Sequence, residues 1–222
     1  MCNFSLNRTG RVTLVVIAVA LSTTVAISPA DAGTSVEARL ETAGRYFRTA
    51  ELARRGNPVR AVSYAKAETL AAQVIRDNPS AAEAHFLLFA ARGRRLLDES
   101  GRPSPRNFWK FSGLNKHLSR TLELDPGHAR ALAAKGGLLL DLPPYLGGDV
   151  QAARRHLERA IKLNPTGPGT RLSLARVLVR QGLRGRAREQ ALLAAHYSCR
   201  RRKSHALREA EEFLRTLDSG SL

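Results

Sequence analysis

The segment Ala129–Pro165, ARALAAKGGLLLDLPPYLGGDVQAARRHLERAIKLNP, predicts two helices joined by a short link. In both halves apolar residues recur at the three- and four-residue spacing of one helix face. The prolines and glycines of residues 143–148 interrupt that pattern, and Pro165 ends it because proline cannot continue a helix. Small residues such as Gly136 and Ala153 would let the two helices approach closely. The segment therefore predicts a tightly packed helical hairpin.

The ending of this hairpin occurs three times in the chain. An apolar turn runs into Asp or Asn and then into proline at Asn78-Pro79, at Asp125-Pro126 and at Asn164-Pro165. The prolines are 47 and 39 residues apart, which indicates units of unequal length. After Gly33 no stretch alternates apolar and polar residues as a strand would. The chain is therefore predicted to be all-α.

These features resemble the tetratricopeptide repeat (TPR), a helical hairpin of about 34 residues with small residues where its helices touch and a closing proline. The resemblance covers residues 36–199 and is closest after Ala129, whereas Phe89 and Thr121 stand where small residues are usual. It implies a right-handed superhelix of about four hairpins, capped by a helix near Ser204–Leu217. The residues at repeat-packing positions are Gly136, Ala153, Leu157, Ala160, Pro165, Leu174, Ala175, Ala187 and Ala194.

The N-terminus has the pattern of a secretory signal peptide. Arg8 and Arg11 precede an uncharged stretch, and Ala30-Asp31-Ala32 supplies the small residues of a cleavage site. Such a signal would direct the protein to the periplasm or to secretion and be cleaved after Ala32. The alternative is that the segment stays uncleaved as a membrane anchor. The expected organisation is a signal peptide (1–32), degenerate hairpins with insertions (33–127), two better-matched hairpins (128–199), and a basic segment, capping helix and tail (200–222).

The link at residues 142–149 permits two interpretations. Its prolines and glycines suit a turn between helices, with Asp149 accepting the free amides that open the next helix. The P-x-x-x-G-G-D run from Pro143 to Asp149, followed by a helix with Ala153 and Ala160, is also similar to the periplasmic T-component family of TRAP-type transporters. That resemblance implies an oligomer that contacts a solute-binding protein or a small ligand.

Positive charge is concentrated in the C-terminal part of the chain. The formal net charge is +17, and residues 171–203 hold ten basic side chains against one acidic side chain, Glu189. Arg176 and Arg180 are four residues apart on a first helix, which would line the concave wall of a superhelix and could hold a carboxylate or phosphate. An acidic protein surface is the expected partner, and contact with an anionic membrane is an alternative. The predicted export signal argues against nucleic acid as the binding partner.

Two aromatic residues are further candidates for partner binding. Trp109 belongs to the aromatic run Phe108–Phe111 beside an insertion, and Tyr145 lies in the 142–149 link. Trp is enriched at the energetic centres of protein interfaces. The alternative for Trp109 is that it packs the insertion back onto the stack.

No group of residues in the sequence suits catalysis or a cofactor. Ser63 and Lys66 have the S-x-x-K spacing of penicillin-recognising enzymes, but neither S-D-N nor K-T-G follows. His196, Cys199 and His205 surround the basic run 200–203, whose field opposes a metal ion. A disulfide through Cys199 could link two chains. The sequence predicts a non-enzymatic scaffold for protein–protein interaction in the cell envelope, and the alternative is a TRAP-transporter-associated component.

Overall fold

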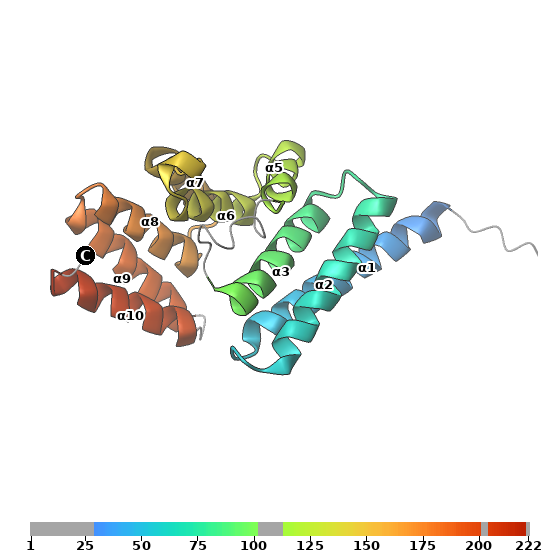
Figure 1. Cartoon of the computed structure of the whole chain (residues 1–222), viewed down its shortest axis with the longest axis horizontal. Coiled ribbons are helices and arrows are strands. Elements are labelled where there is room, and N and C mark those ends of the chain that lie inside the picture. The colour runs from blue at the N-terminus through green and yellow to red at the C-terminus, as the bar shows by residue number, and fades with distance from the viewer. Residues whose placement is uncertain (1–28, 102–112, 201–203, 221–222) are drawn as a thin grey trace, which may run out of the picture.

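The computed structural model describes residues 29–101, 113–200 and 204–220 (Figure 1). Within these ranges it contains α-helices and one short 3-10 turn, Pro144–Leu146, and no strand, which confirms the predicted all-α class. The helices are α1 (Pro29–Leu52), α2 (Pro58–Asp77), α3 (Ala82–Ser100), α5 (Asn115–Leu124), α6 (Ala129–Asp141), α7 (Val150–Leu163), α8 (Pro168–Arg180), α9 (Arg184–Arg200) and α10 (Ser204–Asp218).

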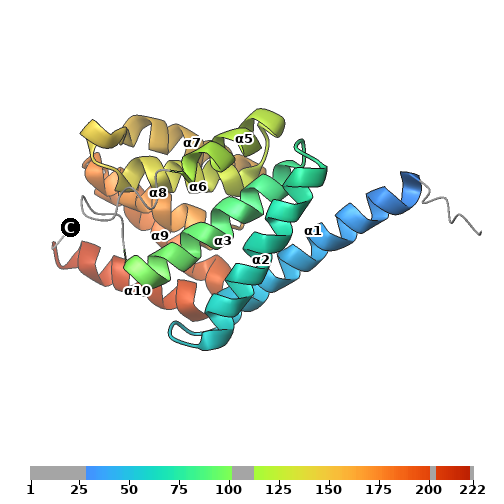
Figure 2. The ribbon, with the colours of Figure 1, turned by 45° about the vertical axis from the view of Figure 1, so that its right-hand side comes forward.

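The helices pack in the order of the sequence. α1 pairs with α2, α3 with α5, α6 with α7, and α8 with α9, while α10 packs on α9. Figures 1 and 2 show the helices following one another from α1 at one end of the molecule to α10 at the other. Four hairpins and a final helix over the open end are the predicted TPR-like stack.

The three repeated helix ends share one backbone geometry. Asn78, Asp125 and Asn164 follow α2, α5 and α7 with φ of −139°, −135° and −136°. Each donates its N–H to the carbonyl four residues earlier, and the proline that follows prevents a further turn. The next hairpin therefore leaves each of these ends in a similar direction.

The two helices of the third hairpin meet at Gly136, as its small size suggests. A Cβ atom added to this buried glycine would lie 2.6 Å from Cγ of Leu157 and 3.0 Å from the carbonyl oxygen of Ala153. In the link between these helices, a Cβ on Gly148 would lie 1.9 Å from the carbonyl oxygen of Leu142, so only glycine fits there. Of the repeat-packing residues, Pro165 is exposed and the others are buried.

Among the described residues, most buried apolar side chains fall into four clusters along the stack. Two clusters lie among α1, α2 and α3, and a third is built around Phe86, Leu118 and Ala131 of α3, α5 and α6. The largest runs from Leu140 to Leu217 and joins α6–α10. Such separation is expected of a stack in which each hairpin touches its neighbours.

Polar contacts also join α3 to the start of α6. Nδ1 of His128 accepts a hydrogen bond from the N–H of Ala131 over 3.2 Å, and Nε2 donates to Glu83 over 2.9 Å. Arg130 donates to the same carboxylate. Burial acts to raise the pKa of Glu83, but the hydrogen bonds from His128 and Arg130 hold it below its ordinary value.

In the part of the chain that the structure describes, no helix has both the length and the apolar character needed to cross a bilayer. Helix α1 begins at Pro29, so it includes residues on both sides of the predicted cleavage position after Ala32. Export and cleavage remain predictions. Residues 1–28 of the predicted signal peptide lie outside the described residues.

Candidate functional site

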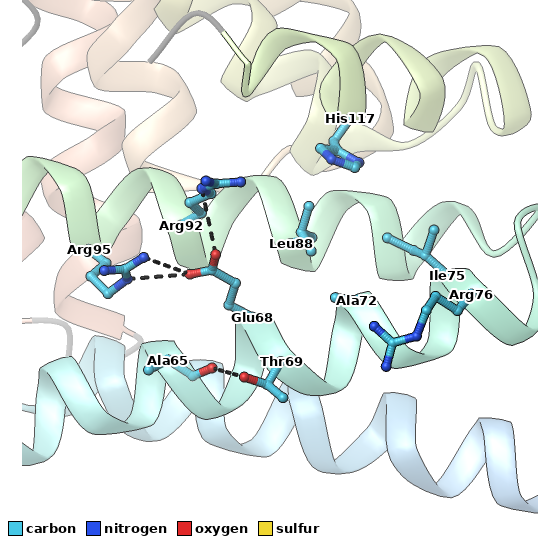
Figure 3. A pocket seen from close by; sticks show the side chains of 10 residues that line it. All are labelled: Ala65, Glu68, Thr69, Ala72, Ile75, Arg76, Leu88, Arg92, Arg95 and His117. Atoms are coloured by element: carbon cyan, nitrogen blue, oxygen red, sulfur yellow. Dashed lines mark hydrogen bonds and ion pairs between the residues drawn. The ribbon is translucent and has the colours of Figure 1, made fainter. Parts of the chain in front are cut away.

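An open pocket of about 680 Å³ lies between α2, α3 and α5. Helix α3 packs against both α2 and α5, and Figure 3 shows its ribbon running between theirs. The exposed stripe of α2 facing the pocket carries small side chains at helical spacing, so the space over α3 is not filled. The lining residues are Ala65, Glu68, Thr69, Ala72, Ile75 and Arg76 of α2, Leu88, Arg92 and Arg95 of α3, and His117 of α5.

One carboxylate at the rim of this pocket is shared by two guanidinium groups (Figure 3). Arg95 donates to Oε2 of Glu68 over 3.2 Å and 3.3 Å and also to Glu99 over 3.0 Å. Burial acts to lower the pKa of Arg95, and the two carboxylates raise it above its ordinary value. Arg92 approaches Glu68 only to 3.6 Å, with its side chain 51% exposed. Arg92 can therefore bind a second carboxylate without leaving its place.

Two histidines connect the pocket to the start of α3. Nε2 of His85 lies 3.1 Å from the carbonyl oxygen of Pro79, so this nitrogen must donate. Nδ1 of His85 then accepts from Nδ1–H of His117 over 3.1 Å. Burial, together with His85, Lys116 and Arg92, lowers the pKa of His117 to about 4. The pocket thus has a neutral imidazole whose Nε2 is a hydrogen-bond acceptor.

The arginines expected in the concave groove form contacts between helices. Arg176 donates to Glu209 of α10 over 2.7 Å, and Nη1 of Arg180 donates to the carbonyl oxygen of Leu140 over 2.5 Å. Both side chains therefore already hold α8 to other helices, and a role in partner binding stays a prediction. Tyr145 is 77% exposed in the 3-10 turn, while Trp109 lies outside the described residues.

The remaining residues considered for chemistry do not meet in one site. Ser63 is buried, whereas Lys66 is exposed and its ammonium lies 5.1 Å from the centre of the Tyr46 ring. Cys199 is an exposed free thiol. No group of three or more His, Cys, Asp or Glu residues in the described ranges could hold a metal ion.

The pocket between α2, α3 and α5 was not predicted from the sequence. The available signal was the stripe of Ala65, Thr69 and Ala72 on α2, since small residues at helical spacing leave room for a partner between longer side chains. The approach of His117 and Arg92 to that stripe depends on how α5 and α3 stack, which residue spacing alone does not determine.

No protein-family model matches the chain, and no curated protein matches it in sequence. Among solved structures the chain is similar to PilF of Pseudomonas aeruginosa, with 18% identity, 83% of this chain and 77% of that chain covered, and a TM-score of 0.49. It is also similar to MamA (17% identity, 80% and 90% covered, TM-score 0.43) and to YrrB, a TPR protein with an unusual peptide-binding site (15%, 82% and 97%, 0.37).

At this level of identity the similarity concerns fold alone. The paired helices of the chain, its repeated helix ends and its glycine contact between α6 and α7 form a TPR-like stack. The comparisons show no match to the T-component family, whose resemblance rests on the 143–149 run.

Proposed function

We propose that the chain is a non-enzymatic scaffold of the cell envelope and that a protein partner docks in the pocket between α2, α3 and α5. The observation that carries the proposal is the combination, in one open pocket, of small and apolar side chains with Arg92 and Arg76. Grooves of this kind bind a helix or an extended segment through an apolar anchor and orient it by polar contacts at the rim.

The lining specifies what the partner segment would carry. The small stripe of α2 and Leu88 suit a modest apolar side chain. Arg92 is 3.6 Å from Glu68 and its side chain is 51% exposed, so it suits a carboxylate of the partner beside that anchor. His117 accepts a hydrogen bond from a backbone N–H or a hydroxyl. A net charge of +17 would draw an acidic partner in at long range.

The envelope location is proposed from the signal-like N-terminus alone. An acidic envelope protein is the partner that fits both this location and the positive charge. A homo-oligomer that contacts a solute-binding protein is the second expectation, and light scattering of the purified chain measures it directly.

A matched pair of substitutions tests the pocket. Thr69 lines it, and Thr49 is an exposed threonine of α1 outside it. Each hydroxyl donates to the carbonyl four residues earlier in its own helix, over 3.0 Å and 3.1 Å. Thr69→Trp would fill the pocket, whereas Thr49→Trp adds the same ring elsewhere.

The measurement is affinity capture from an envelope fraction with the immobilised full chain, quantified by mass spectrometry. We expect the wild type and Thr49→Trp to retain the same acidic partner and Thr69→Trp to lose it, with unchanged circular dichroism in all three. If Thr69→Trp retains that partner, the pocket is not the docking site.

A further inference from the structure

Helix α7 presents a row of basic side chains that have no counter-ion. Arg155, Arg159 and Lys162 are exposed and are spaced four and three residues apart, which places them on one helix face. None of the three forms an ion pair or a hydrogen bond with another described residue. The nearest carboxylates in sequence are already occupied, since Asp149 caps α7 through Ala152 and Glu158 binds Arg154 over 2.8 Å.

The lack of counter-ions on α7 contrasts with the ion pairs that arginines form where helices pack. Elsewhere in the described chain, arginines at helix contacts face carboxylates of neighbouring helices, and these contacts use many of the acidic side chains. These inter-helix pairs include Arg39–Asp77, Arg60–Asp98, Arg92–Glu68, Arg94–Glu51, Arg95–Glu68, Arg130–Glu83, Arg176–Glu209 and Arg188–Asp218. The α7 row is therefore a surplus of charge that folding has not neutralised.

A further cation is recessed beside this row. Lys135 of α6 is half-buried and donates through Nζ to Oδ1 of Asn115 in α5 over 2.9 Å. Burial lowers the pKa of Lys135, and His156 of α7 has its pKa lowered by burial and then by Lys135, Arg155 and Arg159. Lys135 of α6 and Arg155 and Arg159 of α7 therefore add to one positive potential around His156.

We propose that the face of α7 formed by Arg155, Arg159 and Lys162, together with Lys135, is a docking surface for an acidic segment of a protein. The row is about 10 Å long, because seven residues of helix rise 1.5 Å each. A partner helix with carboxylates at i, i+4 and i+7 matches this length. Leu163, 50% exposed and four residues beyond Arg159, offers an apolar contact at the end of the row.

The recessed position of Lys135 favours a protein segment over a lipid surface. Lys135 is half-buried, so a glutamate side chain of a protein segment can reach it more readily than the headgroups of a flat bilayer, which meet the outermost charges. Carboxylates brought to a partly desolvated ammonium also gain more than those at a fully exposed one. The surface lies on α6 and α7 and the proposed pocket on α2, α3 and α5. The two docking proposals can therefore be tested, and refuted, independently.

The test uses the full chain and a labelled helical peptide with glutamates at i, i+4 and i+7, with affinity measured by fluorescence anisotropy at low ionic strength. The variant Arg155→Gln/Arg159→Gln removes two charges from the row. The control Arg208→Gln/Arg215→Gln removes two exposed charges from α10 that have no ion pair among the described residues. A peptide with the same glutamates in scrambled order tests the spacing.

We expect the α7 variant to bind the peptide about tenfold more weakly and the control to change less than about twofold. Thr69→Trp should leave the peptide affinity unchanged. Equal losses in both double variants would mean diffuse attraction by net charge and would overturn the proposal. Sedimentation with phosphatidylglycerol vesicles that depends on the α7 row, without peptide binding, would assign the surface to a membrane and would also overturn it.

Discussion

Gly136 lies against Leu157 so closely that an added methyl group would come within 2.6 Å of Cγ of the leucine. Its neighbour Gly137 has no atom within 4 Å of the corresponding position. The two glycines sit side by side in α6, yet only one faces α7. Alanine substitutions at the two positions therefore distinguish two effects of glycine: its unfavourable free energy within a helix, and the close helix contact that it permits.

Gly136→Ala is expected to destabilise the protein and Gly137→Ala to stabilise it. The first forces α6 and α7 apart and should lower the free energy of unfolding by about 1–3 kcal/mol. The second only restricts the unfolded chain and should raise it by about 0.5–1 kcal/mol. Urea unfolding followed by circular dichroism measures both. Equal stabilities would show that the hairpin tolerates a wider helix separation.

His117 should make stability sensitive to mild acid. Its pKa is about 4 in the folded protein and near the ordinary 6.5 when unfolded, so between these values only the unfolded chain takes up the proton. The melting temperature should therefore fall as pH is lowered from 6.5 to 4. His117→Asn should show a shallower fall. His205→Asn, at an exposed histidine of α10, should follow the wild type, and a His117→Asn profile that does the same would contradict this account.

Glu83 should stabilise the contact between α3 and α6 in its ionised form. Because its pKa is lowered on folding, this contribution is complete above the ordinary value of 4.5 and is lost as pH falls through the folded value. Glu83→Gln should cost about 1 kcal/mol at neutral pH. The difference from the wild type should shrink in acid, as chemical denaturation at several pH values will measure. A difference that stays constant with pH would argue against the ion pair as its source.

Arg180 and Arg176 should differ in their effect on stability. Arg180→Met removes the guanidinium donor from the carbonyl of the buried Leu140 and should lower the free energy of unfolding by about 1–2 kcal/mol. Arg176→Met breaks an ion pair whose side chains are 38% and 41% exposed and should cost less than about 1 kcal/mol. Thermal and urea unfolding test this order. If Arg180→Met kept full stability but weakened partner binding, the groove role expected from the sequence would stand instead.

Much of the fold could be predicted because its determinants are local. Pro79, Pro126 and Pro165 end helices wherever the rest of the chain lies, and Asp149 caps the helix that follows it. Gly182, with φ of +73°, turns the chain between α8 and α9. Such signals need only a few neighbouring residues, so the helices and their pairing follow from the sequence.

The functional surfaces were harder to predict because they depend on distant partners. Arg180 meets the carbonyl of a residue 40 positions earlier, and His117 meets a histidine 32 positions away. Spacing tells which face of a helix a side chain occupies, but not which helix that face meets. The row on α7 lacks counter-ions among the described residues because the nearby carboxylates bind other groups, which residue spacing does not reveal.

In the described part of the chain the apolar interior is divided into four clusters, so one part of the stack is expected to unfold without the others. The α1–α3 end can open while α8–α10, within the largest cluster, stays closed. Amide hydrogens in α8 and α9 should then exchange with solvent more slowly than those in α1. A partner that contacts both ends of the stack would couple their unfolding. Its binding should then turn two separate unfolding transitions into a single cooperative one.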